Sequence, residues 1–168
     1  LLNVQCWARD SKEAGKKYLR HQLPIEEKES IKWLVSYRAV AEAQRLCSNT
    51  TLISVGDREA DVYELFQEAI QNPYGPKLLI RAERTRNRKV EQEDLWQAMK
   101  AEPVAGWLDV AVPRRGSRPA RTAKLHIRFA QVVLRPPARS KFGAVRIWAV
   151  YAREVGYSTK VKEPLDWM

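Results

Sequence analysis

The α/β character of this 168-residue chain rests on the run Thr51-Leu52-Ile53-Ser54-Val55-Gly56-Asp57. Its short, β-branched centre is typical of a strand buried in a mainly parallel sheet, and Gly56-Asp57 marks its end. Residues 59–71 then repeat apolar side chains at helical spacing. A second strand follows at Lys77-Leu78-Leu79-Ile80-Arg81. Strand, helix and strand in this order predict a βαβ unit.

Upstream of this unit, apolar residues recur at close to helical period from Glu27 to Cys47, which predicts a helix ended by Asn49. Residues 1–8 alternate loosely and predict a strand, whereas residues 9–24 carry no clear pattern. The chain thus begins inside an expected strand, and it ends at residues 165–168 where another strand is starting. We therefore expect it to be a fragment of a longer protein.

Downstream of Arg81 the pattern changes. A short helix is predicted around residues 91–100, and the segments beyond it alternate with period two and are punctuated by proline and glycine. These predicted strands are 107–112, 123–129, 132–134 and 145–155. The predicted fold class is α+β, with an α/β part over residues 1–83, a basic and mainly antiparallel β part over 84–162, and a return toward the first part over 163–168.

Charge is distributed unevenly between the two parts. The chain holds 30 Lys and Arg against 20 Asp and Glu, but residues 1–80 balance at 11 of each sign. Residues 81–162 hold 19 basic and 7 acidic side chains, and no carboxylate occurs from Val110 to Arg153. A surface of one sign favours a polyanionic partner. Nucleic acid is favoured over a membrane surface, because the basic residues lie among strands and not along an amphipathic helix.

Several classes are excluded. No run of 18 apolar residues could span a membrane, and the N-terminal residues lack the layout of a signal peptide. Two cysteines, Cys6 and Cys47, cannot build a disulfide scaffold or an all-cysteine zinc site, and they suggest free thiols in a cytosolic protein. The two histidines, His21 and His126, have no partners at ligand spacing.

Asp57 is the main candidate for chemistry. Ligands of open α/β sheets gather where strands end, and Asp57 to Asp61 concentrates three carboxylates and one arginine there. The alternative is that Asp57 only caps a helix. Phosphodiester chemistry with two Mg²⁺ ions requires several carboxylates, and only this one stands at a strand end.

The six tryptophans divide by their surroundings. Trp33 and Trp148 fall on apolar faces and are expected in the core. Trp107 and Trp167 flank the basic β region, where an indole could stack on a base or simply pack against the sheet.

Four segments together resemble a known family. Leu52 to Asp61 is similar to the second-aspartate motif of bacterial DDE transposases in insertion-sequence family four. Glu27 to Trp33, Arg118 to Leu125 and Pro164 to Trp167 resemble further segments of that family in the same order. The similarity covers nearly the whole chain. It implies an RNase H-like core interrupted by a β-rich insertion domain, and an enzyme that cuts and joins DNA at transposon ends.

The resemblance assigns Asp57 as the middle catalytic carboxylate and as a ligand of the Mg²⁺ cofactor. The family's first aspartate would lie upstream of Leu1 and its glutamate downstream of Met168, so this chain alone should be inactive. Arg81 matches an arginine that contacts transposon-end DNA. Glu83 departs from the pattern, since a relative has lysine there.

The resemblance also implies DNA contacts in the insertion domain. Trp167 matches a tryptophan that stacks on a base flipped out during hairpin formation, and Trp107 falls where a relative has tyrosine near the DNA. We expect further contacts from the arginines of the basic part: Arg114, Arg115, Arg118 and Arg121.

The implied partner is transposon-end DNA, bound by a homodimer in the bacterial cytoplasm at the nucleoid, with no membrane association. The alternative is a non-catalytic DNA- or RNA-binding module in which Asp57 is only a helix cap. Adjoining gene sequence would separate the two, because a transposase requires the two further carboxylates.

Overall fold

The computed structural model describes residues 4–6, 23–47, 49–138, 140–159 and 161–168. The chain forms two compact units, Leu1–Arg81 and Ala82–Met168. Helices and strands are mixed and the larger sheet is antiparallel, which confirms the α+β class. Most of the strand predicted over 1–8, and most of the polar stretch 9–24, lie outside the described residues; residues 4–6 form no regular element.

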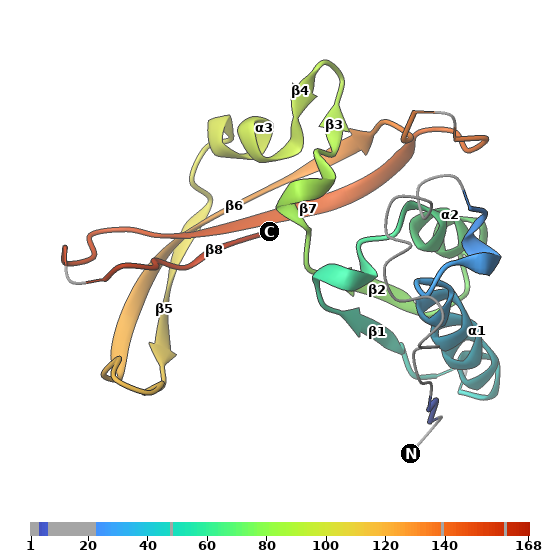
Figure 1. The fold of residues 1–168 in the computed structure, drawn as a ribbon, viewed down its shortest axis with the longest axis horizontal. Coiled ribbons are helices and arrows are strands. Elements are labelled where there is room, and N and C mark those ends of the chain that lie inside the picture. The colour runs from blue at the N-terminus through green and yellow to red at the C-terminus, as the bar shows by residue number, and fades with distance from the viewer. Residues whose placement is uncertain (1–3, 7–22, 48, 139, 160) are drawn as a thin grey trace. The chain divides into compact units, whose positions relative to one another are not determined.

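The first unit combines helices with a two-stranded parallel sheet (Figure 1). The pairing of its two strands aligns Gly56 with Ile80, which confirms the predicted strand–helix–strand unit. The second helix, predicted over 59–71, is divided into a 3₁₀ turn and an α-helix by the non-helical residues Asp61 and Val62. The elements are η2 (Ile25–Glu27), α1 (Ile31–Leu46), β1 (Ile53–Gly56), η3 (Arg58–Ala60), α2 (Tyr63–Gln71) and β2 (Lys77–Ile80).

The core of the first unit lies between α1, α2 and the sheet. Its buried residues are Leu34, Tyr37, Ala60, Val62 and Leu65, and Trp33 packs against them, as predicted. The Tyr37 hydroxyl donates to the carbonyl of Pro76 at 3.2 Å, which ties α1 to the turn before β2.

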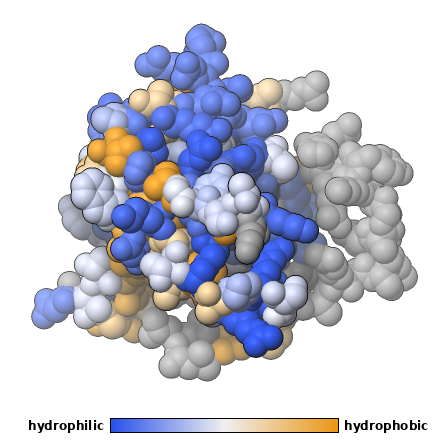
Figure 2. Space-filling model, turned by 90° about the vertical axis from the view of Figure 1, so that its left-hand side faces the viewer, coloured by the Kyte–Doolittle hydropathy of each residue, from blue (hydrophilic) through white to orange (hydrophobic). Residues whose placement is uncertain are grey.

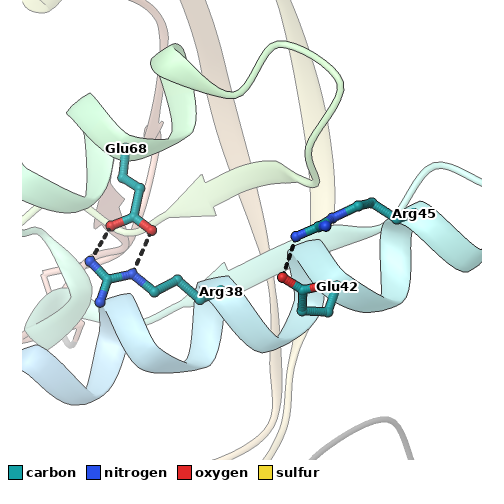
Figure 3. Close-up of polar contacts among 4 residues, drawn as sticks. All are labelled: Arg38, Glu42, Arg45 and Glu68. Atoms are coloured by element: carbon teal, nitrogen blue, oxygen red, sulfur yellow. Dashed lines mark hydrogen bonds and ion pairs between the residues drawn. The ribbon is translucent and has the colours of Figure 1, made fainter.

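Arg38 and Glu68 connect the two helices on their exposed side. The Arg38 guanidinium donates to both carboxylate oxygens of Glu68, at 2.7 and 2.8 Å (Figure 3). The hydrogen bonds to Glu68 raise the pKa of the Arg38 guanidinium above its ordinary value. Arg45 forms a second pair with Glu42 within α1, and its charge suits the last turn of that helix.

The second unit is built on a six-stranded sheet with one helix (Figure 1). The strand order is β4-β3-β6-β7-β8, and β5 also pairs with β6. The elements are η4 (Arg84–Arg86), β3 (Lys89–Val90), β4 (Glu93–Asp94), α3 (Leu95–Ala101), β5 (Gly106–Val112), β6 (Arg121–Leu134), β7 (Val145–Glu154) and β8 (Asp166–Trp167).

The two strands predicted over 123–129 and 132–134 form the single long strand β6. Its pairing with β7 runs without a bulge from Leu125 opposite Glu154 to Leu134 opposite Val145. The buried side nevertheless changes along the strand: Ala123 and Leu125 are buried on one face, Val132 and Leu134 on the other. Because the buried face switches, the alternating apolar pattern of the sequence is broken between the two segments, although the strand itself continues.

The helix α3 covers the Val132 and Leu134 face of the sheet. Trp96 of α3 meets Tyr151 of β7 edge-on, with ring centroids 5.9 Å apart. The Arg84 guanidinium lies 4.2 Å from the Trp96 ring centroid and donates to Asp166 at 2.8 Å. The prediction that Trp148 is a core residue was wrong: its side chain is 65% exposed, because its position in β7 points to the opposite face.

The last residues of the chain belong to this sheet. We expected residues 163–168 to begin a return to the first part; Asp166–Trp167 forms β8 and pairs with β7. No helix in the described part of the chain is long and apolar enough to cross a membrane.

Tyr151 makes the stability of the second unit sensitive to alkaline pH. Burial, aided by the Asp166 carboxylate, raises the pKa of Tyr151 from 10.0 to about 12. The folded state therefore holds this proton more tightly than the unfolded state does. The resulting stabilisation is complete below pH 10 and is lost as pH rises through about 12.

We predict that Tyr151→Phe flattens the decline in unfolding free energy between pH 10 and 12. Urea unfolding at a series of pH values measures this, with Tyr74→Phe as control because Tyr74 is 93% exposed. A Tyr151→Phe protein with the wild-type alkaline slope would contradict the assignment.

Candidate metal ligand and nucleic-acid interface

Asp57 stands where β1 ends and η3 begins. Its backbone is extended, and its carboxylate Oδ1 accepts from the backbone N–H of Glu59 at 2.9 Å. The side chain is exposed to solvent. Asp57 is thus the N-cap of η3, and it also places a carboxylate at the carboxyl edge of the parallel pair.

Arg81 lies beside Asp57 at the same edge. The register aligns Gly56 with Ile80, and the backbone N–H of Arg81 donates to the Gly56 carbonyl at 3.0 Å. The next residues along both strands are Asp57 and Arg81. A Cβ at Gly56 would lie 2.4 Å from that of Ala60, so glycine lets the turn after β1 pack against the sheet.

The other two carboxylates of the segment 57–61 serve the fold. Glu59 pairs with Lys32 of α1 at 2.9 Å, and Asp61 is buried at 1% exposure. Across the described ranges, no group of three or more His, Cys, Asp or Glu side chains could hold a metal ion. Magnesium needs a near-octahedral set of oxygens. Asp57 fits as one ligand, but these residues do not form a complete magnesium site.

The four arginines predicted to bind DNA lie around the β5–β6 connection and differ in their partners. Arg121 donates to both oxygens of Glu154, with 2.9 Å between Nη2 and Oε2, and Glu154 is 3% exposed. Glu154 also accepts from the backbone N–H of Leu165 at 2.8 Å. The Arg121 charge is therefore neutralised inside the fold. The main role of Arg121 is to stabilise the second unit.

Arg118 is also paired, but at the surface. It donates to both oxygens of Glu163 at 2.7 and 3.0 Å. This hydrogen bonding lowers the pKa of the Glu163 carboxyl and raises that of Arg118. Exposed pairs of this kind stabilise a fold only slightly and exchange readily for other anions.

Arg114 and Arg115 are exposed in the turn itself, where the Arg114 Nε donates to the carbonyl of Gly116 at 3.3 Å. Gly116 has a φ of 58°, which favours glycine in this turn. Figure 2 views the left-hand side of Figure 1 and shows many hydrophilic side chains, with smaller apolar patches between them. The turn presents its arginines to solvent.

The two tryptophans predicted to contact DNA lie on opposite faces of the sheet. Trp107 pairs with His126, His126 with Arg153, and Arg153 with Asp166, so all four share one face. Trp167 is the next residue after Asp166 and lies on the other face, opposite Ala152. Trp107 is 74% exposed and Trp167 is 41% exposed. One flat ligand therefore cannot contact both across this sheet.

The second unit contains a basic cavity that the sequence pattern did not predict. It has a volume of about 310 Å³, and its lining includes four cationic residues and no carboxylate. The strand β3 brings Lys89 to the end of β6, where the backbone N–H of Arg135 donates to the Lys89 carbonyl at 2.9 Å. The cationic lining residues are Arg86, Arg88, Lys89 and Arg135. Such a lining suits a phosphate group.

A scan of the sequence against models of known protein families finds no match.

Arg121 and Arg114 should respond differently to substitution. Arg121→Ala leaves the Glu154 carboxylate buried without its guanidinium, and we expect a loss of stability on the order of 3 kcal/mol. Arg114→Ala should leave stability within about 0.5 kcal/mol, as is usual for surface substitutions. Chemical denaturation of both variants measures the difference. Equal stabilities would show that the Arg121–Glu154 pair does not support the fold.

Proposed function

We propose that this chain is the central part of a DDE transposase of insertion-sequence family four, with the first unit belonging to an RNase H-like catalytic core and the second unit being the DNA-binding insertion domain. Asp57 would supply one carboxylate for Mg²⁺ in the complete enzyme. The other two carboxylates of the family have no counterpart in these 168 residues. The chain by itself should neither cleave nor join DNA.

The observation that carries the proposal is the shared position of Asp57 and Arg81. Both directly follow paired parallel strands, at the edge where α/β sheets bind their ligands. A carboxylate and an arginine that follow neighbouring strands suit a site that handles a phosphodiester: the first for a metal, the second for a phosphate.

The charge of the second unit supports DNA as its partner. Residues 82–168 hold 18 basic and 9 acidic side chains. The cationic cavity and the exposed turn arginines add two places where phosphates could bind. Trp167 lies at the sheet edge with 41% of its surface exposed, and in the proposed enzyme it would stack on a flipped base.

A second candidate function is a nucleic-acid-binding module without catalysis. The hydrogen bond from the Glu59 N–H to Asp57 favours it, because helix capping alone would explain that aspartate. Both functions use the same basic second unit, and they differ only in the role of Asp57.

Asp57→Asn separates the two functions, because asparagine caps a helix about as well as aspartate does but is a poor ligand for magnesium. In the complete gene product, we expect this variant to lose transposon-end cleavage while its thermal stability and duplex affinity stay unchanged. Gel assays of nicking and binding measure both properties. Full cleavage by Asp57→Asn would contradict a metal-binding role and show that Asp57 acts only as a helix cap.

The affinity of the 168-residue chain for duplex DNA should fall steeply between about 50 and 200 mM salt, since each neutralised phosphate releases counterions. Arg86→Ala and Arg135→Ala should each reduce the log–log salt slope by about 1. Lys77→Ala in the first unit is the matched loss of charge and should leave the slope unchanged. A flat salt response in the wild-type chain would contradict phosphate binding.

A further inference from the structure

Two large aromatic side chains lie exposed next to each other in the middle of the second unit's sheet. Trp148 of β7 is 65% exposed and Phe129 of β6 is 54% exposed. Their ring centroids are 6.1 Å apart, with an angle of 53° between the planes. Side chains of this size on a sheet are normally buried, and an exposed apolar group of this kind often marks a binding surface.

The register of β6 and β7 sets this pair on one continuous strip. Phe129 stands opposite Val150, Gln131 opposite Trp148, and Val133 opposite Arg146. Because neighbours across strands share a face, all six side chains lie on the same side of the sheet. Tyr151, which contacts Trp96 of α3, lies on the other side. We call these six residues the aromatic strip: Phe129, Gln131, Val133, Arg146, Trp148 and Val150.

The charge of the strip narrows the choice of partner. Its only charged member is Arg146, and the sequence from Val110 to Arg153 holds no carboxylate. A second copy of the chain would bring a second Arg146 to the interface without a carboxylate of the strip to pair with either, because a two-fold interface repeats one patch on both subunits. An anionic partner with flat apolar faces is complementary to it.

We propose that the aromatic strip binds single-stranded nucleic acid by stacking unpaired bases on Trp148 and Phe129, with Arg146 meeting the backbone phosphates. In a duplex the base faces are covered by neighbouring bases, so only unpaired nucleotides can stack on the strip. This inference goes beyond the proposed transposase role, because it uses neither Asp57 nor the basic cavity and applies equally to a non-catalytic binding module.

The test measures binding of the 168-residue chain to a labelled oligothymidylate of about 16 nucleotides, the upper site size of one such platform. Fluorescence anisotropy is compared with that of a labelled duplex of the same length. Trp148→Ala and Phe129→Ala should each weaken single-strand affinity by about 5- to 150-fold, which corresponds to about 1–3 kcal/mol per stacked base. Duplex affinity should stay within about twofold.

Three controls keep the result specific. Trp148→Phe retains a flat ring and should keep most of the single-strand affinity. Tyr74→Ala removes an aromatic side chain that is 93% exposed in the first unit, and it should change nothing. Thermal unfolding of each variant checks the fold, which should persist because both rings of the strip are exposed.

Other outcomes would overturn the proposal. These are an unchanged single-strand affinity in both alanine variants, an equal loss of duplex and single-strand affinity, or no binding of oligothymidylate by the wild-type chain. A self-association detected by sedimentation that Trp148→Ala abolishes, without any effect on oligothymidylate binding, would assign the strip to a second copy of the chain. If duplex binding is also absent, the proposed function fails as well.

Discussion

The uninterrupted antiparallel pairing of β6 with β7 is the constraint on which the second unit depends. Side chains of a strand alternate between faces, so one register fixes the face of every residue in both strands. It places Tyr151 under α3 and leaves Trp148 exposed. Through the neighbouring strands it also sends Trp107 and Trp167 to opposite sides. A shift of β7 by one residue against β6 would move Tyr151 and Trp148, and through β8 also Trp167, to the other face of the sheet.

Ion pairs help a strongly basic unit to fold. Two of its arginines pair with carboxylates: Arg121 with Glu154 at the end of β7, and Arg118 with Glu163 in the segment before β8. Arg84 is shared between the Trp96 ring and Asp166. Arg114 and Arg115 lie exposed in the turn after β5, and four further cationic residues line the cavity beside β3. The fold thus neutralises some of its charge internally and leaves other cationic groups at two places suited to phosphate.

Local pattern predicted the strand–helix–strand part of the first unit well, because these elements follow one another directly along the chain. The β-branched run, the helical spacing and the parallel pairing follow from residues 51–81 alone. The second unit was harder to predict. The change of buried face between Leu125 and Val132 divides one strand into two apparent ones, and apolar neighbours suggest a core position for Trp148 that only the register excludes. Asp57 was found because it follows a strand, whereas the cavity arginines meet only through the pairing of β3 with β6.

The central claim is that the second unit supplies most of the nucleic-acid contacts through its exposed basic groups. Hydrogen–deuterium exchange of the 168-residue chain with and without duplex DNA at low salt tests it most directly. The account predicts slower exchange in residues 84–90 and 113–121, with α1 and α2 unaffected. Slower exchange confined to α1 and α2, or none in the second unit under conditions where DNA is bound, would contradict it.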